Sequence, residues 1–139
     1  MGDFDLGHRV FHTSGGAIHL LATSAPDNYD SSSYEAVGAA VHRCSLAEFL
    51  ELLAADHQVE TLLCEGGGTL VRALVELDAL DEIHLTWAGH TIFGGAESPT
   101  ITGPLGDYLP ASLEFELTHF EPLDNGECFL SYTRKKTSA

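Results

Sequence analysis

The stretch CEGGGTL, residues 64–70, decides the fold expected for this chain. It joins an apolar run, VETLLCE (59–65), to a segment with helical periodicity, TLVRALVELDAL (69–80). Three consecutive glycines lose much conformational entropy on folding, so a tight turn or a close approach to the backbone must compensate for them. The pattern predicts a buried strand at 59–65, a Gly-rich turn, and an amphipathic helix at 69–80.

Outward from this stretch, segments typical of strands and helices alternate along the chain. One helix start is marked by Ser45 followed by Glu48, which is the pattern of a capping box. The expected order is strand 17–23, polar loop 24–35, strand 36–44, helix 46–56, strand 59–65, helix 69–80, strand 81–89, loop 94–110 and hairpin 112–135. Such alternation predicts an α/β fold with a mostly parallel sheet, flanking helices and a C-terminal antiparallel hairpin.

Two local patterns add detail to the C-terminal half. Asp124, Asn125 and Gly126 are typical of a hairpin turn. In the strand at 81–89 the apolar side chains alternate with polar ones, so that Ile83, Leu85 and Trp87 share one face and His84 and Thr86 the other. Two helices cover too little of such a sheet, so we expect a two-fold homodimer.

Composition restricts the class of protein. The 139 residues fit one domain. The formal charge of −15, with 6 Lys plus Arg, excludes a positively charged surface that would bind nucleic acid. No apolar run is long enough to cross a membrane, and the N-terminus does not resemble a signal peptide. Three widely spaced cysteines fit a reducing compartment, so we expect a cytoplasmic protein with the cysteines buried. His8 and His12 lack a third ligand nearby, so no metal site is expected.

The glycines have a physical use where a strand feeds into a helix. The first turn of a helix has free N–H groups and a partial positive charge, and glycines let an anion approach them. The sequence therefore predicts phosphate binding at residues 66–69, with Thr69 as a cap. A strand-to-helix turn without any ligand is the alternative. The stretch matches neither GxxxxGK[ST] nor GxGxxG, which disfavours a P-loop nucleotidase and the usual dinucleotide fingerprint.

These residues resemble the reductase domain of riboflavin biosynthesis. The resemblance rests on Glu65-Gly66-Gly67-Gly68-Thr69-Leu70, Asp81-Glu82, Gly94-Gly95 and the closing hairpin, and it covers about residues 17–134. It implies a dihydrofolate reductase-like fold and an NADPH-dependent reductase of a ribosylamino-pyrimidine phosphate, a small nucleotide-like substrate, or a close pteridine-reductase-like relative. The alternative is a non-catalytic remnant that binds nucleotide phosphate weakly or only self-associates.

The resemblance also implies roles for particular residues. Glu65 would face the substrate, although a solvated strand end is the alternative. Asp81 and Glu82 would orient a loop or a subunit contact. No catalytic side chain is assigned. The cofactor pyrophosphate would lie along Gly66, Gly67, Gly68, Thr69, Leu70, Val71, Arg72 and Ala73.

The chain departs from the family pattern in two places. The segment before Gly94-Gly95 reads AGHTIF, and the family's Ser-x-Asp-Gly motif is absent from residues 1–139, so we expect a single reductase-like domain without the family's N-terminal segment. The strand at 59–65 would then have an unpaired edge, which either FDLGHRVFHTS (4–14) or a partner chain would have to cover. Arg43 is the candidate cation for the 2′-phosphate of NADPH, with a plain surface position as the alternative.

Overall fold

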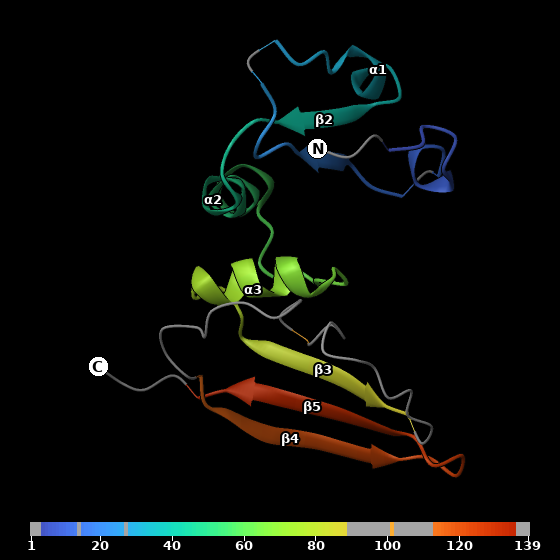
Figure 1. Ribbon diagram of the computed structural model, residues 1–139, viewed down its shortest axis with the longest axis vertical. Helices are drawn as coiled ribbons and strands as arrows, with labels where there is room; N and C mark the ends of the chain where they lie inside the picture. The colour runs from blue at the N-terminus through green and yellow to red at the C-terminus, as the bar shows by residue number, and fades with distance from the viewer. Residues whose placement is uncertain (1–3, 14, 27, 89–100, 102–112, 136–139) are drawn as a thin grey trace, which may run out of the picture. The chain divides into compact units, whose positions relative to one another are not determined.

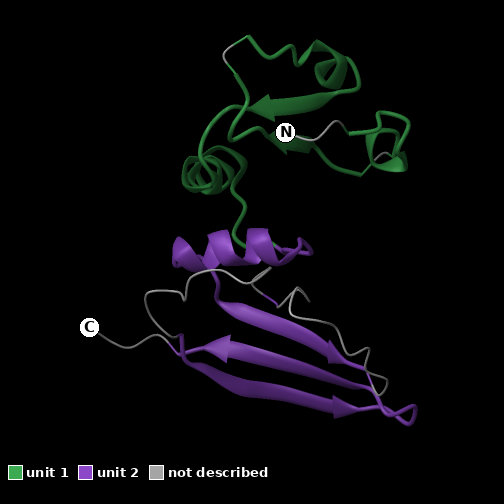
Figure 2. Cartoon of the chain, in the orientation of Figure 1, with its two compact units in different colours: residues 1–62 green, residues 63–139 purple. Residues whose placement is uncertain are grey.

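The computed structural model describes residues 4–13, 15–26, 28–88, 101 and 113–135. The predicted loop at 94–110 therefore lies almost wholly outside the described residues. The chain divides into two compact units, residues 1–62 and residues 63–139 (Figure 2). Each unit has a sheet of its own.

The first unit is built on a parallel pair of strands (Figure 1). Ile18 is opposite Ala39 and Leu21 is opposite His42, which confirms the first two predicted strands. A four-residue helix lies within the segment predicted as a polar loop. The elements are the 3-10 turn η1 (Arg9–Phe11), β1 (Ile18–Leu21), α1 (Ser32–Glu35), β2 (Ala39–His42) and α2 (Leu46–His57).

The core of the first unit is small. Phe11, Leu20, Tyr34 and Ala39 are buried together. The N-terminal segment packs against this core, since the amide of Phe4 donates to the Tyr34 hydroxyl over 3.3 Å. The described part of that segment forms η1 and turns, so it does not supply the strand that residues 4–14 were considered to offer.

Helix α2 begins as predicted. The Glu48 amide donates to Ser45 Oγ over 3.2 Å, and the Ser45 amide donates to Glu48 Oε2 over 2.8 Å, which completes the capping box. The Ser45 amide, and then the Ser45 hydroxyl, which also donates to Glu48 Oε2 over 2.8 Å, lower the pKa of the Glu48 carboxyl. The helix ends at His57, and Gln58 follows in the left-handed conformation at φ 55°.

Removal of this cap gives a simple test of local stability. We expect Ser45→Ala to lower the free energy of unfolding by about 1 kcal/mol, because the Glu48 amide loses its acceptor and the Glu48 carboxylate loses the hydroxyl donor. Chemical denaturation of the full chain measures the change. Ser33→Ala, on the short helix α1, is the matched control and should change it little. An equal loss in both variants would contradict the assigned role of the cap.

The second unit contains one helix and an antiparallel sheet. Strand β5 lies between β3 and β4 (Figure 1), and the predicted hairpin turns at Asp124–Gly126, with Gly126 at φ 84°. Parallel pairing is thus confined, among the described residues, to the first unit. The elements are α3 (Gly68–Glu76), β3 (Glu82–Trp87), β4 (Phe115–Pro122) and β5 (Cys128–Arg134).

Helix α3 is shorter than the sequence predicts. It ends at Glu76 rather than at residue 80, because Asp78 adopts the left-handed conformation at φ 60°. The Ala79 amide donates a hydrogen bond to the Leu74 carbonyl over 2.9 Å. Arg134 Nη2 forms an ion pair with the Asp78 carboxylate at 2.5 Å. A left-handed residue after the last turn is a common helix stop, and here a strand residue far along the chain stabilises it.

The predicted strand at 59–65 is wrong. The structure assigns no strand to these residues, and Leu62 and Leu63 are 53% and 72% exposed. An apolar, extended run forms a strand only when a neighbour pairs with its backbone. Among the described residues no strand pairs with this segment.

The two faces of the three-stranded sheet differ in chemistry. Opposite residues of an antiparallel pair share a face, so the register separates an apolar face from a polar one. The polar face has Glu82, His84, Ser131 and His119. The apolar face carries Ile83, Leu85, Trp87, Leu117, Phe120, Pro122, Cys128, Leu130 and Tyr132, which confirms the predicted alternation in β3.

Candidate phosphate-binding turn at the start of α3

The glycine stretch leads directly into α3. Gly67 is the N-cap, with φ −68° and ψ 170°, and no side chain caps the helix. Thr69 is therefore inside the first turn, and its predicted capping role is wrong. The Leu70 amide donates to the Gly67 carbonyl over 3.0 Å. Among the described residues no acceptor is in place for the amides of Gly68 and Thr69, so this turn retains donors for an anion.

The space around the two leading glycines differs. A Cβ added at Gly67 would meet no atom within 4 Å, so the approach to the N-cap is open. A Cβ at Gly66 would lie 2.7 Å from Leu70 Cδ2, which would have to move. Gly66 thus permits the close contact with Leu70, whereas no described residue requires glycine at Gly67, where φ is open to any side chain. The open space at the N-cap leaves room for a ligand at the start of the helix.

The other predicted cofactor residues continue along α3. Glu65 is exposed just before the helix, but it does not end a strand, because residues 59–65 form none. Thr69 and Leu70 are exposed, whereas Val71, Arg72 and Ala73 are half-buried. Arg72 Nε pairs with Glu76 Oε1 at 2.9 Å one turn later, so its charge is partly compensated within the helix.

Arg43, the predicted 2′-phosphate cation, belongs to the first unit. Its guanidinium donates to the Tyr29 carbonyl and lies 5.8 Å from the centre of the Tyr29 ring. These contacts fix the side chain against its own unit.

The remaining polar candidates have local partners. His8 Nδ1 accepts from the Val10 amide over 3.3 Å, and His12 Nε2 lies 2.8 Å from the Leu6 carbonyl oxygen. Within the described ranges no group of three or more His, Cys, Asp or Glu side chains is arranged to hold a metal ion. Cys44, Cys64 and Cys128 are free thiols, and they are half-buried rather than buried as predicted.

Sequence reasoning missed a cluster of imidazoles in the first unit. His19 of β1 contacts both His42 of β2 and His57 of α2, yet the three are spread over 39 sequence positions. No spacing motif connects them, since only the pairing of β1 with β2 brings the first two together. The sequence gives no local sign of such a cluster.

In the part of the chain that the structure describes, no helix is long and apolar enough to cross a membrane.

A shallow hollow near the end of α2 is lined by Ala54, Gln58, Val59 and Glu60. None of the predicted site residues lines it. The glycine turn at the start of α3 therefore remains the candidate site.

Comparison with solved structures identifies the fold. The chain is similar to a pyrimidine reductase-like protein from Corynebacterium diphtheriae, with a TM-score of 0.69 and 20% identity over 86% of this chain and 50% of that one. It is also similar to RibD from Acinetobacter baumannii, with a TM-score of 0.74 and 20% identity over 98% of this chain and 36% of that one. The chain thus spans half or less of the length of both proteins. These likenesses support the expected dihydrofolate reductase-like α/β fold.

Comparison with curated proteins finds no match. Comparison with protein families gives a match to the RibD C-terminal domain over residues 1–129. This range includes the whole first unit, most of the second unit and the whole glycine turn, and it extends over most of the 139 residues. The chain therefore belongs to the RibD C-terminal domain family, a family of riboflavin-pathway reductases.

Proposed function

We propose that this chain is an NADPH-dependent reductase that acts on a ribosylamino-pyrimidine phosphate in the cytoplasm. The observation that carries the proposal is the open N-terminus of α3, where the amides of Gly68 and Thr69 lack acceptors among the described residues. Family membership supplies the class of reaction. The family match also supports one reductase domain over residues 1–139, because it extends across both units.

The residues of the turn fit a pyrophosphate. An anion at the helix start needs N–H donors and free space, and the amides of Gly68 and Thr69 and the open space at Gly67 provide these without a lysine or arginine. Leu70, Val71, Arg72 and Ala73 would continue the contact along the helix, and Glu65 would face the substrate. The bound nicotinamide would supply the hydride, so the protein has to bind and orient the two reactants.

The test separates binding from turnover. We expect calorimetric titration of the full chain with NADPH to show binding, and absorbance to show NADPH oxidation when the ribosylamino-pyrimidine phosphate is added. Binding without oxidation would favour the alternative function, a non-catalytic module that binds nucleotide phosphate weakly. Absence of binding would contradict the assignment of the glycine turn.

We also propose that the chain forms a two-fold homodimer through the apolar face of the β3–β5–β4 sheet. On this face Trp87, Leu117 and Phe120 are 64%, 49% and 57% exposed. Large apolar patches of this kind are typical of interfaces between proteins. A two-fold contact would pair the face with its own copy.

A further inference from the structure

Three histidines of the first unit form one aromatic cluster. His19 Nδ1 and His42 Nε2 are 2.8 Å apart, and their rings stack with centroids 5.1 Å apart and planes 20° apart. The ring of His57 meets the ring of His19 edge-on, with centroids 4.5 Å apart. The ring of His42 also contacts Phe49, at 5.1 Å. The cluster therefore joins β1, β2 and α2.

The hydrogen bond between His19 and His42 limits the charge that the cluster can hold. One of the two facing nitrogens must carry a proton and the other must be bare. A single added proton can sit on an outward nitrogen and leave the bond in place. When both rings are imidazolium, both facing nitrogens carry protons, so the bond is lost and two positive charges repel at contact distance.

The groups around the cluster give little compensation for such charges. On β1 the neighbours of His19 are Ile18 and Leu20, and across the strands the titratable ring is His42. On α2 the ring that faces His19 is His57. Among the described residues no carboxylate forms an ion pair with any of the three imidazoles.

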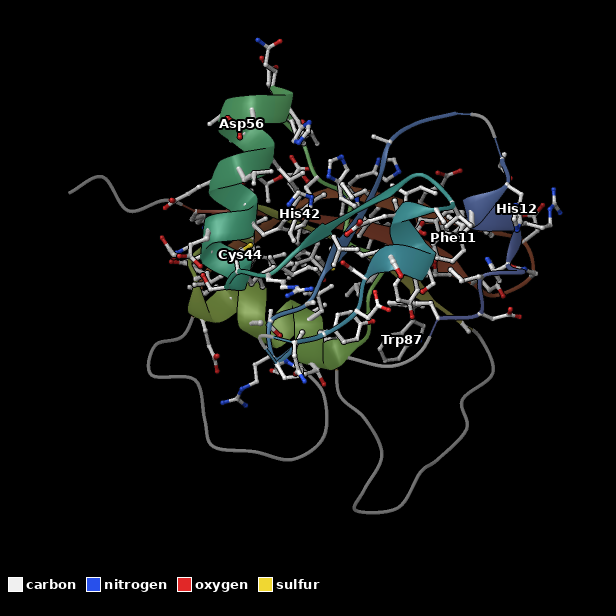
Figure 3. All side chains as sticks on the ribbon, turned by 90° about the horizontal axis from the view of Figure 1, so that it is seen from above. Phe11, His12, His42, Cys44, Asp56 and Trp87 are labelled. Atoms are coloured by element: carbon white, nitrogen blue, oxygen red, sulfur yellow. The ribbon has the colours of Figure 1, made fainter. Side chains whose placement is uncertain are left out.

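The charged residues nearest in sequence to the cluster have other orientations or partners. Glu48 is held in the capping box of α2, and Arg43 donates to the Tyr29 carbonyl. Asp56 lies near the C-terminal end of α2 (Figure 3), but adjacent residues of a helix do not face each other, so it does not share the face of His57.

The contacts of the cluster matter because α2 is otherwise weakly held. No residue of α2 is buried. Two of its aromatic contacts with the strands involve histidines, His57 with His19 and Phe49 with His42. An isolated helix of this length is marginal in water, so α2 depends on its attachment to the strands.

We propose that the His19–His42–His57 cluster is a pH-sensitive lock, which holds α2 on the β1–β2 sheet when neutral and releases it when protonated. This device is independent of the proposed reductase activity. Histidine is the side chain whose charge changes near neutral pH, so small acidification suffices to operate the lock.

The direction of the effect follows from proton binding. Burial, then the charges of His57 and His42, lower the pKa of His19 below its usual value. In the unfolded chain His19 thus takes up a proton near pH 6.5, where His19 of the folded chain does not. The stabilisation is fully present above about pH 6.5 and is lost as the pH falls through the lower pKa of His19 in the folded chain.

Amide hydrogen exchange of the full chain, followed by NMR, tests the lock. We expect protection factors in α2 and β1, corrected for intrinsic exchange, to fall about tenfold between about pH 7.5 and about pH 5.5, because protonation breaks the His19–His42 hydrogen bond and brings like charges into contact. His19→Gln should abolish this dependence, because glutamine keeps a hydrogen-bonding group but does not titrate. If His19→Gln fails to fold, His57→Gln should weaken the dependence while it leaves the His19–His42 bond intact.

His119→Gln on β4 is the matched control, since it removes one exposed histidine of the other unit. It should keep the wild-type response. The proposal is overturned if wild-type protection is independent of pH, or if the His19→Gln and His57→Gln variants follow the wild type.

Discussion

Replacement of Gly67 by aspartate is expected to weaken NADPH binding about tenfold to a hundredfold while it makes the fold slightly more stable. The φ of −68° is open to any residue, and a Cβ at this position meets no atom within 4 Å. Aspartate is a better N-cap than glycine, and its charge favours the helix start, so the free energy of unfolding should rise by about 0.5 kcal/mol.

The same carboxylate would occupy the amides that a phosphate needs. Hydrogen bonds from N–H groups to a charged acceptor contribute about 1.5–3 kcal/mol each, which corresponds to the expected loss of affinity. Gly67→Val is expected to block the approach as well, but valine is a poor N-cap, so that variant also weakens the helix. Aspartate separates the two effects because stability and binding move in opposite directions.

Calorimetric titration with NADPH and a denaturation curve of the full chain give both quantities. Gly16→Asp is the matched control, because Gly16 is exposed, has open space for a Cβ and receives the same charge. Equal affinities of the Gly67→Asp and Gly16→Asp chains would show that the phosphate binds elsewhere.

Features determined by neighbouring residues were predictable from the sequence. The capping box of α2 needs only Ser45 and Glu48, and the hairpin turn needs only Asp124–Gly126. The predicted alternation of apolar and polar side chains in β3 is also confirmed, since its apolar residues share a face with those of β5. Short-range geometry is sufficient for all of these.

Features that depend on distant residues were not predictable. Residues 59–65 have the composition of a strand, but a strand exists only with a paired neighbour, and the sequence does not supply the neighbour. The end of α3 depends on Asp78 and on its ion pair with Arg134, 56 positions away. The histidine cluster likewise depends on the register of β1 against β2.

The candidate site falls between these two classes. The glycine turn is local, so its position at the start of α3 follows from residues 66–69. The cap was misassigned to Thr69 because the helix starts earlier than its apolar periodicity indicates. Because the N-cap is Gly67, the free amides are those of the residues that follow it. The test of the phosphate site is therefore made at Gly67 and not at Thr69.

The apolar face of the β3–β5–β4 sheet is expected to place two copies of the chain in contact. Phe120 lies on this face opposite Leu130, and Phe129 lies on the polar face opposite Thr86. Both phenylalanines are exposed, at 57% and 41%. The sheet therefore offers the same side chain on each face, one at the proposed interface and one outside it.

We expect Phe120→Lys to convert the dimer to a monomer, because a stable interface excludes unpaired charges from its apolar centre. Light scattering at micromolar concentration should give twice the chain mass of 14.9 kDa for the wild type and for Phe129→Lys, but 14.9 kDa for Phe120→Lys. A wild-type chain at 14.9 kDa would refute the dimer. If Phe129→Lys were a monomer and Phe120→Lys remained a dimer, the contact would lie on the polar face. Glu82, His84 and His119 would then need partners across the interface.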